Sequence, residues 1–114
     1  NAQQLIINEI SQGTGSSEYV EFAVIGVPTC ITPVPTLDLR NVILDDNNGY
    51  FAPGSGTGIA PGAVRFANIP FWQNIPQGSY IVIYNNTSPN TSLPPDDTSL
   101  IDGNCRLIIP ANSN

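Results

Sequence analysis

Three glutamates, Glu9, Glu18 and Glu21, lie in the first two apolar runs of the chain and could in principle supply acid–base chemistry. If these runs pair as neighbouring strands, two carboxyl groups about 5 Å apart would suit retaining glycoside hydrolysis. That reaction also needs a cleft lined by aromatic rings. The alternative is structural: Glu9 and the adjacent Asn8 hydrogen-bond the backbone of a neighbouring loop, or Arg40 or Arg65 neutralises one of the acids. We favour the structural role.

Other catalytic arrangements are missing from the sequence. The chain has no histidine, so it lacks both the commonest general base and the commonest zinc ligand. Two cysteines without histidine make neither a thiol protease pair nor a zinc cluster, and neither of the common glycine-rich phosphate loops occurs. We therefore predict that the protein is not an enzyme and has no catalytic residues.

A run of hard oxygen ligands occurs at Asp45, Asp46 and Asn47, and a second acidic group occupies residues 96–102. Calcium is bound by six to eight such oxygens. The first run lacks the spacing of an EF-hand, and the Asn48-Gly49 step that follows it is explained by turn chemistry alone. A solvated turn is the preferred interpretation, with calcium as the alternative, and no other cofactor is expected.

The two cysteines, Cys30 and Cys105, could close a loop of about 75 residues. Such a disulfide would contribute on the order of 4 kcal/mol of stability in the chain-entropy model. The alternative is two separate thiols buried as small apolar side chains. We expect the disulfide.

The only tryptophan, Trp72, follows Phe71 in a segment that we expect to be a structured turn. Together with Tyr50, Phe51 and Tyr84, these rings could form an aromatic platform that binds carbohydrate or a partner protein. The alternative is that Trp72 closes the end of the hydrophobic core. Phe71 and Trp72 are therefore recorded as a candidate binding surface.

Composition limits the partners. With 114 residues, 40% of them hydrophobic, the chain has the size of one domain. A net charge of −6 repels nucleic acid. No apolar run approaches the roughly 20 residues of a membrane-spanning helix, so we expect no membrane insertion.

Short apolar runs of alternating or β-branched residues predict strands rather than helices. The first run should place Leu5 and Ile7 on one face and Ile6 and Ile10 on the other, packed on both sides. The run at residues 79–85 should be central in its sheet. Predicted strands are residues 4–10, 18–25, 37–44, 63–69, 79–85 and 105–110, of which the first two form a β-hairpin. Strands at this spacing indicate an all-β sandwich or barrel, with mostly antiparallel strands.

Several motifs resemble the bacterial lamin tail domain family. They are the Asn8-Glu9 pair ending the first strand, EYVEF at residues 18–22, the DLxN-V-L pattern of residues 38–44, and PxGSYIVIY at residues 76–84. Asn41-Val42 stands where the family usually has Gly-Trp. The family's closing strands, which would follow Ile109, are not in the sequence.

The resemblance implies an immunoglobulin-like β-sandwich without catalytic residues, used in bacteria as an accessory domain of secreted or surface proteins. Asn1-Ala2 is interpreted as the remnant of an expression tag and residues 3–114 as one domain. We expect a non-catalytic extracellular interaction domain of a larger secreted or cell-surface protein; the alternative is a binding module for carbohydrate or calcium. Missing closing strands would leave a sheet edge to be covered by a loop, completed by further residues, or paired with a second copy, so edge-to-edge self-association is also predicted.

Overall fold

The structure, a computed structural model, describes residues 3–11, 17–26, 33–45, 63–87 and 89–111. Contacts along the chain divide it into two compact units. The first is formed by residues 1–37 and 75–114, and the second by residues 38–74. Nearly all regular structure in the described residues is β, and four of the five strand pairings are antiparallel. The predicted all-β, sandwich-like class is thus confirmed.

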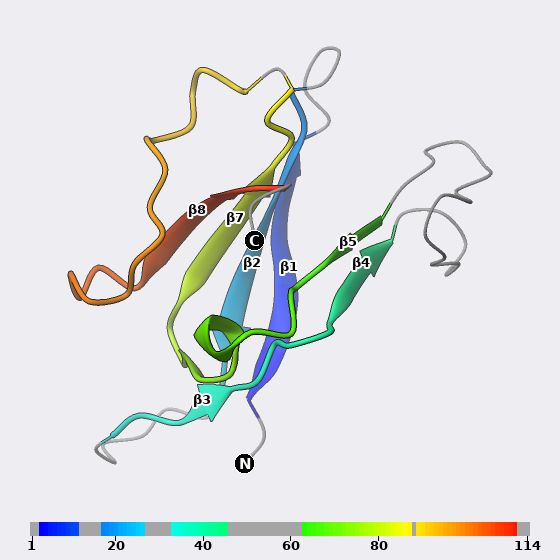
Figure 1. Ribbon diagram of the computed structural model, residues 1–114. Helices are drawn as coiled ribbons and strands as arrows, with labels where there is room; N and C mark the ends of the chain where they lie inside the picture. Colours follow the sequence, from blue (N-terminus) through cyan, green and yellow to red (C-terminus); the bar gives the residue numbers. More distant parts are fainter. Residues whose placement is uncertain (1–2, 12–16, 27–32, 46–62, 88, 112–114) are drawn as a thin grey trace. The chain divides into compact units, whose positions relative to one another are not determined.

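The first unit contains a four-stranded sheet with the order β1-β2-β7-β8 (Figure 1). Its strands are β1 (Gln4–Ser11), β2 (Tyr19–Ile25), β7 (Tyr80–Tyr84) and β8 (Arg106–Pro110). β1 and β2 pair antiparallel, which confirms the predicted hairpin. β7 lies between β2 and β8, which confirms that the most β-branched run is central.

β7 and β8 pair in parallel, unlike every other pair of strands described. A parallel partner has to be reached by a crossover, because the chain must return to the same end of the sheet. Residues 85–105 make this crossover, drawn from yellow to orange in Figure 1. The crossover is polar and rich in turns, and Leu93 packs against the sheet.

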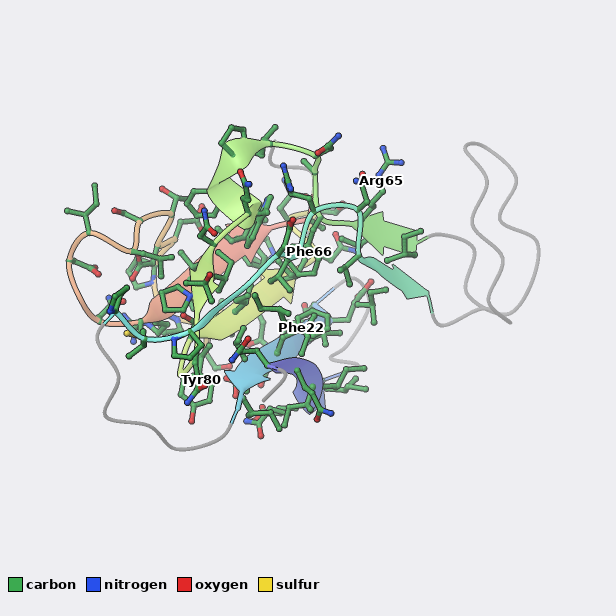
Figure 2. The ribbon with its side chains drawn as sticks, turned by 90° about the horizontal axis from the view of Figure 1, so that it is seen from below. Phe22, Arg65, Phe66 and Tyr80 are labelled. Carbon is green, nitrogen blue, oxygen red and sulfur yellow. The ribbon has the colours of Figure 1, made fainter. Side chains whose placement is uncertain are left out.

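The register places two sets of side chains on opposite faces of the sheet. One set, the core face, is almost entirely apolar and buried. On β2, β7 and β8 it consists of Val20, Phe22, Val24, Ile81, Ile83, Leu107 and Ile109. The other set, here named the tyrosine face, consists of Tyr19, Glu21, Tyr80, Val82, Tyr84, Arg106 and Ile108. Phe22 and Tyr80, labelled in Figure 2, extend from these opposite faces.

β1 is an edge strand, so the expectation that it is packed on both sides is wrong. Ile6, Ile7 and Ile10 are 36%, 49% and 61% exposed. The register also shifts between Ile7 and Glu9, so that Asn8 is an extra residue in a β-bulge. The bulge turns Ile10 onto the face of Leu5 and Ile7, opposite to the face predicted for it, because Ile10 now pairs with Val20.

The outer edge of β8 is closed by its own crossover. Ile108 exchanges two backbone hydrogen bonds with Asp97, at 2.8 and 3.1 Å. The N–H of Arg106 donates to Oδ1 of Asn104 at 2.8 Å, and Pro110 has no N–H. Each outward-facing position of this strand therefore either bonds within the chain or lacks a donor, which protects the edge from other strands.

A two-stranded ladder in the first unit joins β3 (Thr36–Leu37) to β6 (Ile75–Pro76). The second unit contains the antiparallel pair β4 (Ile43–Asp45) and β5 (Ala63–Arg65) and a short 3-10 helix, η1 (Pro70–Trp72). The predicted strand at residues 37–44 is therefore wrong as a single element, since it is divided between β3 and β4.

A local turn causes this division. Asp38 Oδ1 accepts a 3.0 Å hydrogen bond from the N–H of Arg40, and the N–H of Val42 donates to the carbonyl of Leu39 at 3.1 Å. Asn41 has a φ of +66°, in the left-handed region that short polar side chains tolerate best after glycine. An aspartate that bonds the backbone two residues on competes with strand pairing, so the apolar pattern alone was misleading here.

Candidate functional site

A cavity of about 440 Å³ lies against the tyrosine face of the first unit. Its floor is apolar and formed by Val82 and Ile108, which are 5% and 1% exposed. Leu93 and Pro94 of the crossover contribute to its wall. It is a shallow hollow, wide open to solvent, rather than an enclosed pocket.

Polar and aromatic groups surround this floor. Tyr80 is 50% exposed, and Asn8, Tyr19, Glu21 and Arg106 complete the lining. The strands fix their spacing: Glu21 pairs with Val82, which pairs with Ile108, two residues beyond Arg106. Since neighbouring strands are about 4.8 Å apart, the carboxylate strand and the guanidinium strand are separated by roughly 10 Å.

Two hydrogen bonds hold the acidic side of the site. Asn8, the bulge residue, donates from Nδ2 to Oε1 of Glu21 at 2.6 Å, and the hydroxyl of Tyr19 donates to Oε1 of Glu9. The bond to Glu9 raises the pKa of Tyr19. Glu9 and Glu21 are cross-strand partners, because the two strands that bear them pair as predicted. Their bonds go to side chains, rather than to the loop backbone predicted for Asn8 and Glu9.

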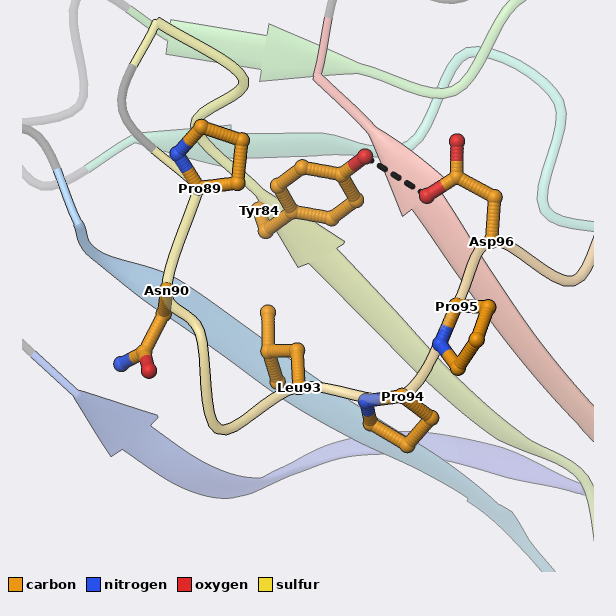
Figure 3. Close-up of a pocket in the computed structure, with 7 residues that line it drawn as sticks. All are labelled: Tyr84, Pro89, Asn90, Leu93, Pro94, Pro95 and Asp96. Carbon is orange, nitrogen blue, oxygen red and sulfur yellow. Dashed lines mark hydrogen bonds between the residues drawn. The ribbon is translucent and has the colours of Figure 1, made fainter.

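The crossover bears a second, smaller cavity of about 280 Å³ between it and Tyr84 (Figure 3). Prolines 89, 94 and 95 surround the tyrosine ring there. The Tyr84 hydroxyl donates to Oδ1 of Asp96 at 2.6 Å, and this bond raises the pKa of Tyr84. This contact fixes the crossover over the sheet.

The end of the β2–β7 ladder is held by a further polar pair. Asn85 donates from Nδ2 to Oε1 of Glu18 at 2.9 Å, and its N–H donates to the Glu18 carbonyl at 3.0 Å. The side-chain bond lowers the pKa of Glu18. Glu18 is therefore a structural residue in this arrangement, and it does not line either cavity.

The proposed calcium ligands fall mainly outside the described residues. Asp46 and Asn47 are not described, and Asp45 ends β4, where it pairs with Ala63. In the second acidic group, Asn104 Nδ2 donates to both Asp97 and Asp102 at 2.8 Å. Within the described ranges, no three histidine, cysteine or acidic side chains gather as metal ligands.

The disulfide remains untested, because Cys30 is outside the described residues. Cys105 precedes β8 with a φ of +56°, and its thiol lies 3.9 Å from the carbonyl of Gly103. Among the residues described, Cys105 has no disulfide partner.

The candidate surface of Phe71 and Trp72 is in the second unit. Trp72 is 5% exposed and meets both Phe66 and Phe71 edge-on, at centroid distances of 4.8 and 4.7 Å. Phe71 is 37% exposed, so its ring is the part of this pair that solvent reaches. Tyr50 and Phe51 are not described, and Tyr84 belongs to the first unit.

Tyr80 and Arg106 were not among the sequence candidates. The alternation of Tyr80, Val82 and Tyr84 was visible in the sequence, but the position of Arg106 beside Tyr80 depends on the parallel register of β8. Arg40, considered as a partner for the glutamates, instead pairs with Asp38 at 2.6 Å.

No helix in the described part of the chain has the length and apolar character needed to span a membrane. Comparisons with protein-family models, with curated proteins and with solved structures found no match to this chain.

Proposed function

We propose that this chain is a non-catalytic interaction domain of a larger secreted or cell-surface protein, and that it binds its partner through the tyrosine face. The observation that carries the proposal is the cavity on this face, where half-exposed Tyr80 adjoins an apolar floor and polar side chains. Exposed aromatic groups beside a few fixed polar groups are typical of binding sites.

The arrangement of the carboxylates supports binding rather than catalysis. Glu9 and Glu21 each accept a hydrogen bond from a neighbouring side chain, Tyr19 and Asn8, and both glutamates lie on the same pair of strands. A hydrolase would need one acid protonated and the other ionised, and such a pair is created by contrasting environments. Here neither carboxyl group is fully buried: Glu9 is exposed and Glu21 is half-buried.

The extracellular location is supported by the lamin-tail resemblance, and it predicts that Cys30 pairs with Cys105. It is tested by comparing the thiol content of protein secreted through an oxidising compartment with that of protein made in a reducing one. Two reactive thiols in the secreted material would count against the disulfide.

The binding role is tested by cosedimentation with bacterial cell-envelope fractions. We expect the wild-type domain to sediment with the envelope. Tyr80→Ala should lose most of this binding, whereas Phe71→Ala should retain it. The Phe71 variant is a matched control because it removes a partly exposed ring in the other unit. Absence of binding by the wild type, or equal loss in both variants, would overturn the proposal.

A further inference from the structure

We propose that the ligand of the tyrosine face is a short, neutral oligosaccharide. This inference rests on the proposed function and adds the chemical class of the partner. It follows from the cavity lined by Tyr19, Glu21, Tyr80 and Arg106 over Val82 and Ile108. Each property of this lining excludes another class of ligand.

A purely apolar ligand does not fit the rim. Glu21, Asn8 and Arg106 line the cavity together with the apolar floor. Covering a carboxylate, an amide and a guanidinium with hydrocarbon would remove their water and give no hydrogen bond in return, which is costly. The ligand must therefore offer several hydrogen-bonding groups as well as an apolar surface.

An anionic ligand is opposed by charge. The chain carries a net charge of −6, and Glu9 and Glu21 stand side by side on this face. Arg106 supplies a single positive charge in the cavity, against the summed negative field of the domain. Acidic polysaccharides and phosphorylated ligands are thereby disfavoured.

A small organic cation does not fit either, because the two tyrosines are too far apart to enclose it. Tyr80 pairs with Ala23, four residues beyond Tyr19 on β2, so their Cα atoms are separated by about 13 Å along the strand direction. An ammonium group must lie within roughly 6 Å of each ring centre to gain from both. Arg106 also repels a cation at the Tyr80 end.

The same spacing suits an elongated, hydroxyl-bearing chain. A sugar ring has an apolar face of C–H groups that can lie on Tyr80 or over Val82 and Ile108, and hydroxyls at its edges. Those hydroxyls can donate to the Glu21 carboxylate and accept from the Arg106 guanidinium, so a chain of a few sugars reaches across the cavity. The bond from Asn8 holds Glu21 in position before the ligand arrives.

The test is a titration of the ¹⁵N-labelled domain with cellohexaose, xylohexaose and mannohexaose, followed by NMR. We expect at least one of these neutral sugars to shift the amides of Tyr80, Val82 and Ile108. Tyr80→Ala should weaken binding at least about tenfold, equal to about 1.4 kcal/mol. Tyr80→Phe keeps the ring and should lose less affinity than Tyr80→Ala, whereas Phe71→Ala, in the other unit, should bind as the wild type does.

Galacturonic acid hexamer and tetramethylammonium serve as the anionic and cationic probes. Binding of either one as tightly as the best neutral sugar would overturn the inference, as would shifts confined to the surroundings of Phe71. If no neutral sugar shifts the tyrosine face while Tyr80→Ala still abolishes envelope binding, the saccharide inference fails and the proposed function stands. If the wild type does not bind the envelope, the proposed function fails first.

Discussion

The hydroxyl of Tyr84, in the central strand β7, donates a 2.6 Å hydrogen bond to Oδ1 of Asp96 in the crossover that follows it. Tyr84 is buried beneath prolines of the same crossover. Through this bond the sheet holds the segment that contributes Leu93 and Pro94 to the wall of the larger cavity. The stability of the site is therefore linked to a single tyrosine.

Replacing Tyr84 by phenylalanine should lower the free energy of unfolding by about 1 kcal/mol, because the ring remains and only the hydrogen bond to a solvent-exposed carboxylate is lost. Urea denaturation measures the change. Tyr80→Phe removes a hydroxyl from a half-exposed ring and should leave stability unchanged. Equal effects of the two substitutions would contradict a specific role for the Tyr84 bond.

This bond also predicts a loss of stability in alkali. The pKa of Tyr84 is raised by the bond to Asp96. A group whose folded pKa is raised contributes stability that is complete below its unfolded value, near 10, and is lost as the pH rises through the folded value. Above about pH 10 the difference between the wild type and Tyr84→Phe should therefore shrink, and a constant difference would contradict the assignment.

The hydrogen bond from Asn85 to Glu18 predicts a loss of stability in acid. Its pKa is lowered by the hydrogen bond from Asn85, so its contribution is present above the unfolded value, near 4.3, and disappears as the pH falls through the folded value. Thermal melts from about pH 6 to about pH 3 should show Glu18→Gln losing less stability than the wild type. Parallel curves would show that the bond is absent in solution.

Asn41 is predicted to be sensitive to backbone strain. Its φ of +66° should make Asn41→Ala less stable by about 1 kcal/mol, whereas Asn41→Gly should change stability by less than about 0.5 kcal/mol. Asn68→Ala, at another exposed asparagine, is the control. Differential scanning calorimetry gives the comparison, and a harmless Asn41→Ala would argue against this turn.

Removal of the Ser79 hydroxyl should make the protein more stable. It is 0% exposed, and its Oγ finds no hydrogen-bond partner among the described residues. Ser79→Ala removes an unsatisfied buried polar group and should raise the free energy of unfolding by about 1 kcal/mol. Its backbone bonds to Val24 and Pro76 are kept. A less stable variant would reveal a partner for the hydroxyl.

Self-association through sheet edges should stop at two copies. Among the described strands of the four-stranded sheet, β8 is closed by Asp97 and Asn104, whereas β1 exposes Ile7 and Ile10, so β1 is the edge available for pairing. Pairing of β1 with β1 joins identical surfaces and leaves no further edge. Light scattering should show monomers and dimers of the wild type, and only monomers of Ile7→Lys. Species larger than a dimer would contradict this prediction.

The sequence was sufficient for the features that depend on local pattern. The Leu5–Ile25 hairpin and the central position of Tyr80–Tyr84 followed from alternation and β-branched content. The prediction of a single strand over residues 37–44 was wrong because Asp38 and Asn41 form a turn within an apolar run. The face predicted for Ile10 was wrong because one bulged residue, Asn8, shifts the alternation of side chains. A bulge of a single residue cannot be recognised from the hydropathy pattern.

The candidate site was harder to foresee than the strands. Tyr19, Glu21, Tyr80 and Arg106 come from three separate strands, and Arg106 lies beside Tyr80 only because β8 runs parallel to β7. Nothing in the run Arg106–Pro110 distinguishes a parallel from an antiparallel partner. The lining of the cavity therefore depends on the register of strands that are distant in the sequence, which residue types alone do not reveal.

The parallel pairing of β7 with β8 sets an order of events during synthesis. The β1–β2 hairpin can form as soon as it leaves the ribosome, since its pairing is local. Leu107 and Ile108, among the most buried side chains, lie in the last of the described strands and dock only after residues 85–105 have folded back. Until then the edge of β7 that pairs with β8 is open, and a chaperone could bind the nascent chain there.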